Sequence, residues 1–401
     1  MPAFYLARRL AISDVSVLDK PGITLHWKCR MKPNLLNWTT VRRISVIFVL
    51  GLMFGFADPA IAVAPRDAAP PSCNPVGPIS PICGVHGPED IEQTPDGRHL
   101  VMSELPEHFD HPARGLVLMD LATDHVASLP ISSKFEAGWG DPSCIAPPAQ
   151  IGSHGIHLST RSDGRLELLV VNHAQRESIE ALELIRDGTG YAAIWHGCVV
   201  NPDGLMNSVS ATFDGGFVAT VMLDKTTAAR KDALDVMVSG ADTGYLVEWH
   251  PDAGLVRLPN SEAPMNNGIQ ILSTSPRFIY FNAWTGKQVR KYDRQAHRVT
   301  DLADLTFHPD NLRVRADGKL IVTGIDELQS WKACSLRQGE FCRTGFTAVT
   351  LDPDTMAAAP LYHGEPGVLA GASVGVQEGN TLYVGSFMGD RLLKIDLSAY
   401  R

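Results

Sequence analysis

The feature that most constrains the fold of this chain is a pattern that recurs six times along it. Each copy begins with a polar residue, continues through a short alternating strand and a tight turn, and ends in a second apolar strand. Successive leading residues lie 65, 53, 60, 43 and 63 positions apart, enough for a four-stranded sheet and a long loop in each copy. The leading residues are Glu89, His154, Asn207, Asn267, Asp310 with Asn311, and Ser373.

Six copies of this size predict an all-β chain, folded as a six-bladed β-propeller over residues 63–401. Amphipathic helical periodicity is scarce, and Asp-Gly and similar turns separate the apolar runs. The run Leu392–Leu397 is expected to close the ring by completing a blade with strands from the other end of the chain. A pair of β-sandwiches or a two-domain all-β protein remains the alternative.

The leading residues should meet at one mouth of the central channel, because the first strand of each propeller blade lines that channel. Carboxylate and amide oxygens dominate among them, which favours Ca²⁺, a hard cation with about six to eight ligands, over Zn²⁺ or copper. Taken singly, each asparagine before a strand is more often a turn residue that bonds its own backbone. The common position of these residues in the repeat is what points to a metal.

Two histidines belong to one copy of the pattern. His154 leads it, and His173 closes the apolar strand Leu168–Asn172 that follows the turn. Both side chains could therefore face the same mouth, where one would serve as a base and the other as its partner. The alternative is a pair of ordinary surface or core histidines.

These segments resemble the paraoxonase (arylesterase/lactonase) family, whose members are six-bladed calcium propellers. The resemblance rests on Gly87–Glu92, His154–Ile156 with Leu168–His173, Met265–Ile269 and Asp310–Leu312, and extends from about residue 85 to the C-terminus. It implies a catalytic calcium ion. The ligands that it implies are Glu89, Asn207, Asn267, Asp310 and Asn311.

The resemblance also implies a second, structural calcium ion, for which Asp90 and the carbonyl of Ile156 are available. The family uses an aspartate directly after the residue that matches Asn207, whereas this chain has Ser208. The second site is therefore expected to be weaker or empty. No cysteine follows Cys342, although the family closes its propeller with a disulfide near the C-terminus.

The preferred function is that of a calcium-dependent hydrolase of lactones or aryl esters. The cation would polarise the carbonyl, His154 would deprotonate the attacking water, and His173 would orient it or relay the proton. The chain has no Gly-x-Ser-x-Gly elbow that would supply a serine nucleophile. Two alternatives stay open: a sugar-lactonase-type propeller without a histidine base, and a non-catalytic calcium-binding propeller.

Trp139, Trp284 and Trp331 could line the pocket, although tryptophans more often pack in a core.

The N-terminal region predicts export to the periplasm or the medium. The apolar run Ile44–Ala57 follows Arg42 and Arg43 and leads to Ala60-Ile61-Ala62, as in a signal peptide. It is shorter than the ~20 residues that cross a bilayer, so membrane contact is expected only through an uncleaved signal segment. Residues 1–62 are assigned to this signal peptide and an extension before it, with translation expected to begin at Met31.

The chain carries a formal net charge of −9 and lacks a long basic run, which excludes nucleic acid as a partner and leaves a small-molecule ester or lactone. Six cysteines follow residue 62, an even number that favours three disulfides in an exported protein. Cys144 and Cys198 lie shortly before His154 and Asn207, so their loops are expected to meet above the channel between neighbouring blades. The predicted pairs are Cys144–Cys198, Cys73–Cys83 and Cys334–Cys342, with other pairings left open.

Overall fold

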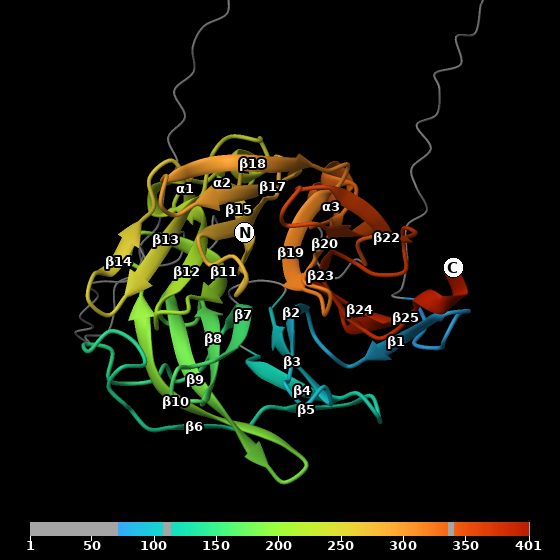
Figure 1. Cartoon of the computed structure of the whole chain (residues 1–401). Coiled ribbons are helices and arrows are strands. Elements are labelled where there is room, and N and C mark those ends of the chain that lie inside the picture. Colours follow the sequence, from blue (N-terminus) through green and yellow to red (C-terminus); the bar gives the residue numbers. More distant parts are fainter. Residues whose placement is uncertain (1–70, 107–113, 336–340, 401) are drawn as a thin grey trace, which may run out of the picture. The chain divides into compact units, whose positions relative to one another are not determined.

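The computed structural model describes residues 71–106, 114–335 and 341–400. The expected signal segment and the expected start at Met31 lie outside the described residues. Six separate sheets account for the strands, and their innermost strands surround a common centre (Figure 1). The predicted six-bladed β-propeller is therefore confirmed.

Each blade takes its strands in chain order from the centre outward, except where noted below. Blade 1 contains β2 (Pro88–Gln93), β3 (His99–Glu104), β4 (Leu116–Asp120) and β5 (His125–Ser128). Blade 2 contains β7 (Ser153–Thr160), β8 (Leu166–Asn172), β9 (Ser178–Asp187) and β10 (Gly190–Val200). Blade 3 contains β11 (Gly204–Ala211), β12 (Phe217–Asp224), β13 (Tyr245–His250) and β14 (Gly254–Arg257).

The second half of the ring repeats this plan. Blade 4 contains β15 (Asn266–Ile271), β16 (Phe278–Ala283), β17 (Gln288–Asp293) and β18 (Arg298–Asp304). Blade 5 contains β19 (His308–Val314), β20 (Leu320–Ile325), β21 (Phe346–Leu351) and β22 (Ala358–Gly364). Blade 6 contains β23 (Ala372–Glu378), β24 (Thr381–Ser386), β25 (Arg391–Asp396) and, as its outer strand, β1 (Ile79–Cys83).

The ring is closed by β1 and β25, which come from opposite ends of the described chain. They pair antiparallel in continuous register from Ile79 opposite Ile395 to Cys83 opposite Arg391. This confirms the predicted closing strand near the C-terminus. Closure thus uses main-chain hydrogen bonds in place of a C-terminal disulfide.

Apolar side chains fill the space between the faces of adjacent blades. One buried cluster joins Leu169 and Ile179 of blade 2 to Val209, Ala219 and Trp249 of blade 3. Because both faces of an inner or middle strand are covered in this way, those strands appear in the sequence as continuous apolar runs, such as Leu168–Val171. Outer strands such as β18 are largely exposed and mixed in polarity.

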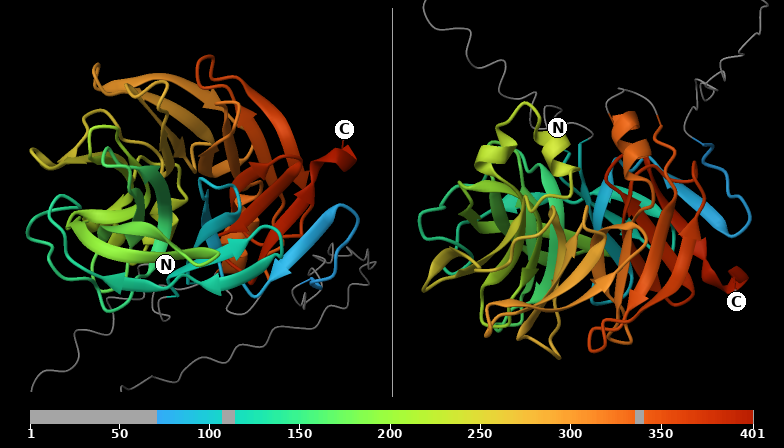
Figure 2. Two further views of the ribbon diagram at one scale, coloured as in Figure 1. Left: turned by 60° about the horizontal axis from the view of Figure 1, so that its bottom comes forward. Right: turned by 90° about the horizontal axis from the view of Figure 1, so that it is seen from above.

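Short helices lie on one side of the strand ring, as the right-hand view of Figure 2 shows. α1 (Lys225–Ala228) and α2 (Ala233–Met237) connect β12 to β13, and α3 (Leu328–Ser335) follows β20. A single 3₁₀ turn, η2 (Leu397–Tyr400), follows β25. Within the described ranges, no helix is long and apolar enough to cross a membrane. The sequence analysis does not predict these helices, because each is too short to show a periodicity.

The three predicted disulfides are present, with Cα–Cα distances of 6.1 Å for Cys73–Cys83, 5.5 Å for Cys144–Cys198 and 5.6 Å for Cys334–Cys342. The position expected for the second bond needs correction. Cys198 lies inside β10 of blade 2, and the loop of Cys144 leads into β7 of the same blade, so this bond lies within one blade and not between two. A fifth strand, β6 (Ile131–Ser133), pairs parallel with β10 at the outer edge of blade 2.

Candidate active site

The inner strand of every blade carries the same irregularity at its start. In each, an advance of three residues along the inner strand is matched by an advance of two along the neighbouring strand, which is the pattern of a β-bulge. The bulge lies between Pro88 and Ile91 in β2, and at the equivalent place in the other five. The first residue within each bulge is the leading residue of the repeat: Glu89, His154, Asn207, Asn267, Asp310 and Ser373.

Contacts between different blades bring these residues together. Asn311 donates a hydrogen bond to Glu89 Oε1 over 2.7 Å, and Ser373 donates to the Glu89 carbonyl over 2.6 Å. Glu89 Oε1 lies 3.7 Å from His154 Nε2, and Asn207 Nδ2 lies 3.3 Å from the same nitrogen. Asn267 bonds the carboxylate of Asp310. The structure therefore brings all five sequence-predicted calcium ligands together with His154.

Four of the five predicted ligands carry a buried oxygen that has no hydrogen-bond partner among the described residues. The atoms are Glu89 Oε2, Asn207 Oδ1, Asn267 Oδ1 and Asn311 Oδ1. An unsatisfied buried acceptor costs about 1–3 kcal/mol, so four in one ring require an explanation. A hard cation bound by these oxygens would satisfy all of them, and the donor set fits Ca²⁺.

The two carboxylates of the ring are held close together away from water. Burial raises the pKa of Glu89 well above its usual range, and the charges of Asp90 and Asp310 raise it further, while the hydrogen bond from Asn311 opposes them. Burial and Asp90 raise the pKa of Asp310 in the same way. A divalent cation between them would remove this repulsion. Among the described residues, no three His, Cys, Asp or Glu side chains gather as a metal cluster, so amide oxygens are needed to complete any set.

A chain of hydrogen bonds leads away from the ring. His154 Nδ1 lies 2.8 Å from His173 Nε2, and His173 Nδ1 lies 2.9 Å from Glu177 Oε2. The other oxygen of Glu177 accepts a hydrogen bond of 2.7 Å from the main-chain N–H of Met206. Burial lowers the pKa of His154 well below its usual value, and the neighbouring His173 lowers it further, which keeps the imidazole neutral.

The carboxylate of Glu177, at the end of these hydrogen bonds, selects the tautomers of both imidazoles. Because Glu177 can only accept, His173 Nδ1 carries a proton, so His173 Nε2 accepts from the Nδ1–H of His154. The lone pair of His154 Nε2 is then left facing the ring of ligands, where Asn207 donates to it. The sequence analysis misses Glu177. Its only sequence signal is its position four residues after His173, in the short turn between β8 and β9.

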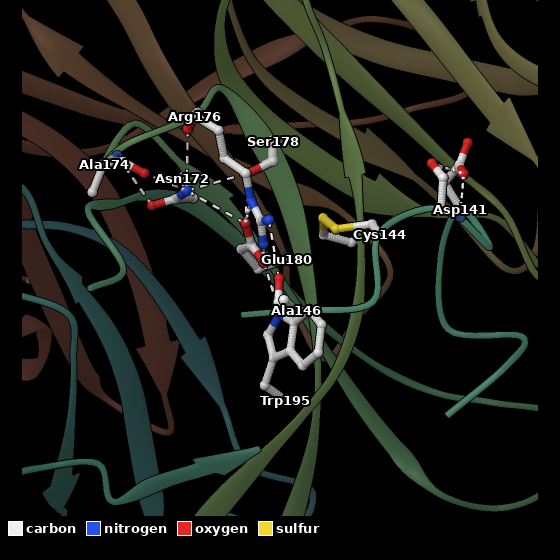
Figure 3. The surroundings of a disulfide bond; sticks show 11 residues. Asp141, Cys144, Ala146, Asn172, Ala174, Arg176, Ser178, Glu180 and Trp195 are labelled. Atoms are coloured by element: carbon white, nitrogen blue, oxygen red, sulfur yellow. Dashed lines mark hydrogen bonds and ion pairs between the residues drawn. A yellow bond between two sulfur atoms is a disulfide. The ribbon is translucent and has the colours of Figure 1, made fainter. Parts of the chain in front are cut away.

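The turn that carries His173 and Glu177 is fixed from both sides (Figure 3). The side chain of Asn172 donates to the carbonyls of Ala174 and Arg176, each over 3.1 Å. Arg176 in turn pairs with the fully buried Glu180 and donates to the carbonyl of Ala146, two residues beyond the Cys144–Cys198 disulfide. The disulfide therefore holds the segment against which this turn is anchored.

An apolar cluster covers the same mouth of the channel. We call it the apolar cover, and it contains Met222, Leu223, Met237, Met265, Trp284, Ile325, Leu328 and Trp331. Met222 Sδ lies 3.8 Å from Asn207 Nδ2, so the cover reaches the ring of ligands. The indole rings of Trp284 and Trp331 meet edge to face, with centroids 5.2 Å apart. Trp139 lies elsewhere, stacked beneath Arg161 between blades 2 and 3.

The two groups expected at the second calcium site both contact a guanidinium. Arg313 Nη2 forms an ion pair with Asp90 and donates to the Ile156 carbonyl over 2.8 Å. Ser208, which stands in place of an aspartate, is fully buried, and its hydroxyl has no partner among the residues that the structure describes.

Comparisons with known proteins show how far this chain has diverged. No family model matches it, and no curated protein is similar in sequence. Among solved structures, a luciferin-regenerating enzyme is 13% identical, with 78% of this chain and 92% of that one covered and a TM-score of 0.47. A gluconolactonase-like protein is 15% identical, with 79% and 91% covered and a TM-score of 0.46. The β-propeller domain of Cps50 (Swd1) from Myceliophteria thermophila is 14% identical, with 78% and 88% covered and a TM-score of 0.39. Likenesses this distant carry no argument about function, which must come from the site itself.

Proposed function

We propose that this protein is an exported, calcium-dependent hydrolase of lactones or aryl esters. The observation that carries the proposal is the lone pair of His154 Nε2, which faces a ring of buried oxygens that lack partners. A carboxylic ester can be hydrolysed without a serine nucleophile when a general base activates water beside a bound cation. The three disulfides fit an oxidising, exported environment.

Calcium would be held by Glu89, Asn207, Asn267, Asp310 and Asn311. When bound, the ion would polarise the substrate carbonyl and stabilise the negative charge that develops on its oxygen.

The protein's own groups would move the proton. His154 Nε2 removes a proton from the attacking water, and the hydroxide oxygen forms the new bond to the acyl carbon. The imidazolium is stabilised through His173 by the carboxylate of Glu177. His154 then returns the proton to the alkoxide or phenoxide oxygen as the ester bond breaks, so water and ester become acid and alcohol. The apolar cover supplies a dry wall for the acyl or aryl group.

A panel of lactones and phenyl esters, assayed with calcium and with excess EGTA, tests the proposal. Hydrolysis that requires calcium is expected, and turnover that persists in EGTA would contradict it. A non-catalytic calcium-binding propeller would hydrolyse nothing on the panel while still binding calcium. A sugar-lactonase-type enzyme without a histidine base would keep most of its rate when His154 and His173 are both replaced.

A further inference from the structure

A charged side chain lies in the channel next to the ring of ligands. Arg313 follows Asn311 by two positions on β19, and its guanidinium contacts Asp90, the residue after the proposed ligand Glu89. Arg313 is 3% exposed. An arginine this deeply buried is rare unless its charge is paired.

The hydrogen bonds of Arg313 all end on oxygen atoms that a cation could also use. Besides its ion pair with Asp90, the guanidinium donates to the carbonyls of Ile156 and Ile91, each over 2.8 Å, and of Leu312 over 2.9 Å. These oxygens come from β2, β7 and β19, which belong to three different blades. One carboxylate and several carbonyls, gathered around a positive charge, make a cradle of the kind that holds calcium.

We propose that the guanidinium of Arg313 takes the place of a second, structural calcium ion, so that the channel contains one calcium ion and one built-in cation. Asp90 and the Ile156 carbonyl are the groups that a second ion would need, and the same nitrogen of Arg313 already bonds both. The calcium ion in this statement rests on the proposed function, whereas the role of Arg313 does not.

The charges at this position are compatible with a guanidinium in place of a calcium ion. A calcium ion between Asp90 and a second aspartate would balance two negative charges with two positive ones. This chain has the neutral Ser208 in place of the second aspartate, and the guanidinium of Arg313 forms an ion pair with Asp90. Ser208 occupies the bulge of β11 that corresponds to the bulge of Asp90 in β2, and it packs against β7, where a Cβ on Gly155 would lie 2.6 Å from Ser208 Cα. A neutral residue at position 208 is therefore compatible with a guanidinium at this site.

A second carboxylate also faces the guanidinium. Glu92 Oε1 lies 3.6 Å from Arg313 Nε and adds a second negative charge at the guanidinium.

The test combines calcium stoichiometry with thermal melting on the full chain. The wild type is expected to bind a single tight calcium ion by equilibrium dialysis. Arg313→Met is expected to lower the melting temperature by on the order of 10 °C at every calcium concentration, because Asp90 is left buried without a positively charged partner. The control Arg315→Met removes a half-exposed arginine two residues further along and should melt as the wild type does.

The double variant Ser208→Asp with Arg313→Ala restores the acidic residue and frees the cradle. It is expected to bind one more calcium ion than the wild type and to recover stability as calcium is added. Two tight ions in the wild type, an unchanged melting temperature for Arg313→Met, or no added ion in the double variant would each overturn the inference. If the wild type binds no calcium at all, the proposed function fails, while the difference of one ion between wild type and double variant still decides the role of Arg313.

Discussion

Glu177 acts on the candidate base without touching it. Its carboxylate accepts from His173, whose other nitrogen then accepts from His154, so a residue two hydrogen bonds away determines which nitrogen of His154 is unprotonated. The main-chain N–H of Met206 occupies the second oxygen of Glu177 and fixes the orientation of the carboxylate. This chain of contacts makes Glu177 a positioning residue whose replacement can be designed.

Glu177→Gln is expected to lower kcat by about 100-fold or more with little change in KM. The oxygen of the new amide must stay on the N–H of Met206, so its NH₂ group faces His173 and reverses both tautomers. His154 Nε2 then carries a proton and can no longer act as a base. Steady-state kinetics on the best substrate of the panel measure the effect.

His154→Gln should lose at least as much activity as Glu177→Gln. His196→Gln is the matched control, because His196 bonds Glu183 over 2.9 Å in the same blade but outside the channel. A control that loses as much activity as the Glu177 variant would indicate general damage to blade 2 and contradict the positioning role.

Asp310→Asn is expected to change stability in opposite directions with and without calcium. In EGTA the melting temperature should rise, because a buried carboxylate that is repelled by its neighbours becomes neutral. In calcium the same variant should melt below the wild type, because a charged ligand has been lost. Thermal melts under both conditions decide the point, and shifts of the same sign would remove Asp310 from the metal site.

At the level of the strands, the six bulges direct the repeated polar side chains toward the candidate site. A regular strand would direct Glu89 and Asp90 to opposite faces, whereas a bulge redirects both side chains locally. The turn between β8 and β9 adds the second histidine, and the Cys144–Cys198 disulfide holds the segment against which Arg176 anchors this turn. The disulfide therefore has a mechanical link to the candidate base.

Replacing Cys144 and Cys198 with serine is expected to lower the free energy of unfolding by about 4 kcal/mol, the chain-entropy value for a loop of this length. It should also lower kcat, because the anchor of the His173 turn becomes looser. The matched control is the same replacement of Cys73 and Cys83, which should cost stability but leave kcat unchanged. Denaturant unfolding and kinetics on both variants test this, and equal kcat losses would argue against the link.

At the scale of the whole propeller, closure by β1 decides whether the ring is continuous. Without β1, the edge of β25 would present unpaired N–H and C=O groups and the buried face of Ile395. Leu393 and Ile395 belong to the core of blade 6, so this edge would also be apolar.

A chain that begins at Gly84 is therefore expected to aggregate or to lose its cooperative melt. A chain that begins at Val63 keeps β1 and the Cys73–Cys83 disulfide and should remain cooperative. Size-exclusion chromatography and thermal melting compare the two. A cooperative, monomeric melt for the shorter chain would show that five complete blades hold the ring without its outer closing strand.

Features that depend on local pattern could be predicted from the sequence. Apolar runs between turns predicted the strands, the spacing of six polar residues predicted the number of blades, and the even set of cysteines predicted the disulfides. The leading residues could be identified because each occupies the same place in its repeat, so that any fold which superposes the repeats brings them together. For the same reason the sequence already identifies Glu89 and Asp310 as candidate metal ligands.

Residues that have no counterpart in the other repeats find partners that become apparent only in the folded chain. Arg313 meets Asp90 across 223 positions, and in the sequence it looks like the solvent-facing residue of an ordinary strand. Glu177 lies in a turn, where a glutamate is unremarkable until His173 is placed beside it. The short helices have too few residues to be stable alone, and α2 and α3 each bury side chains in the apolar cover. Local pattern specifies strands and repeats because these depend on neighbours in the chain, whereas a buried charge finds its partner only when closure of the ring brings distant blades together.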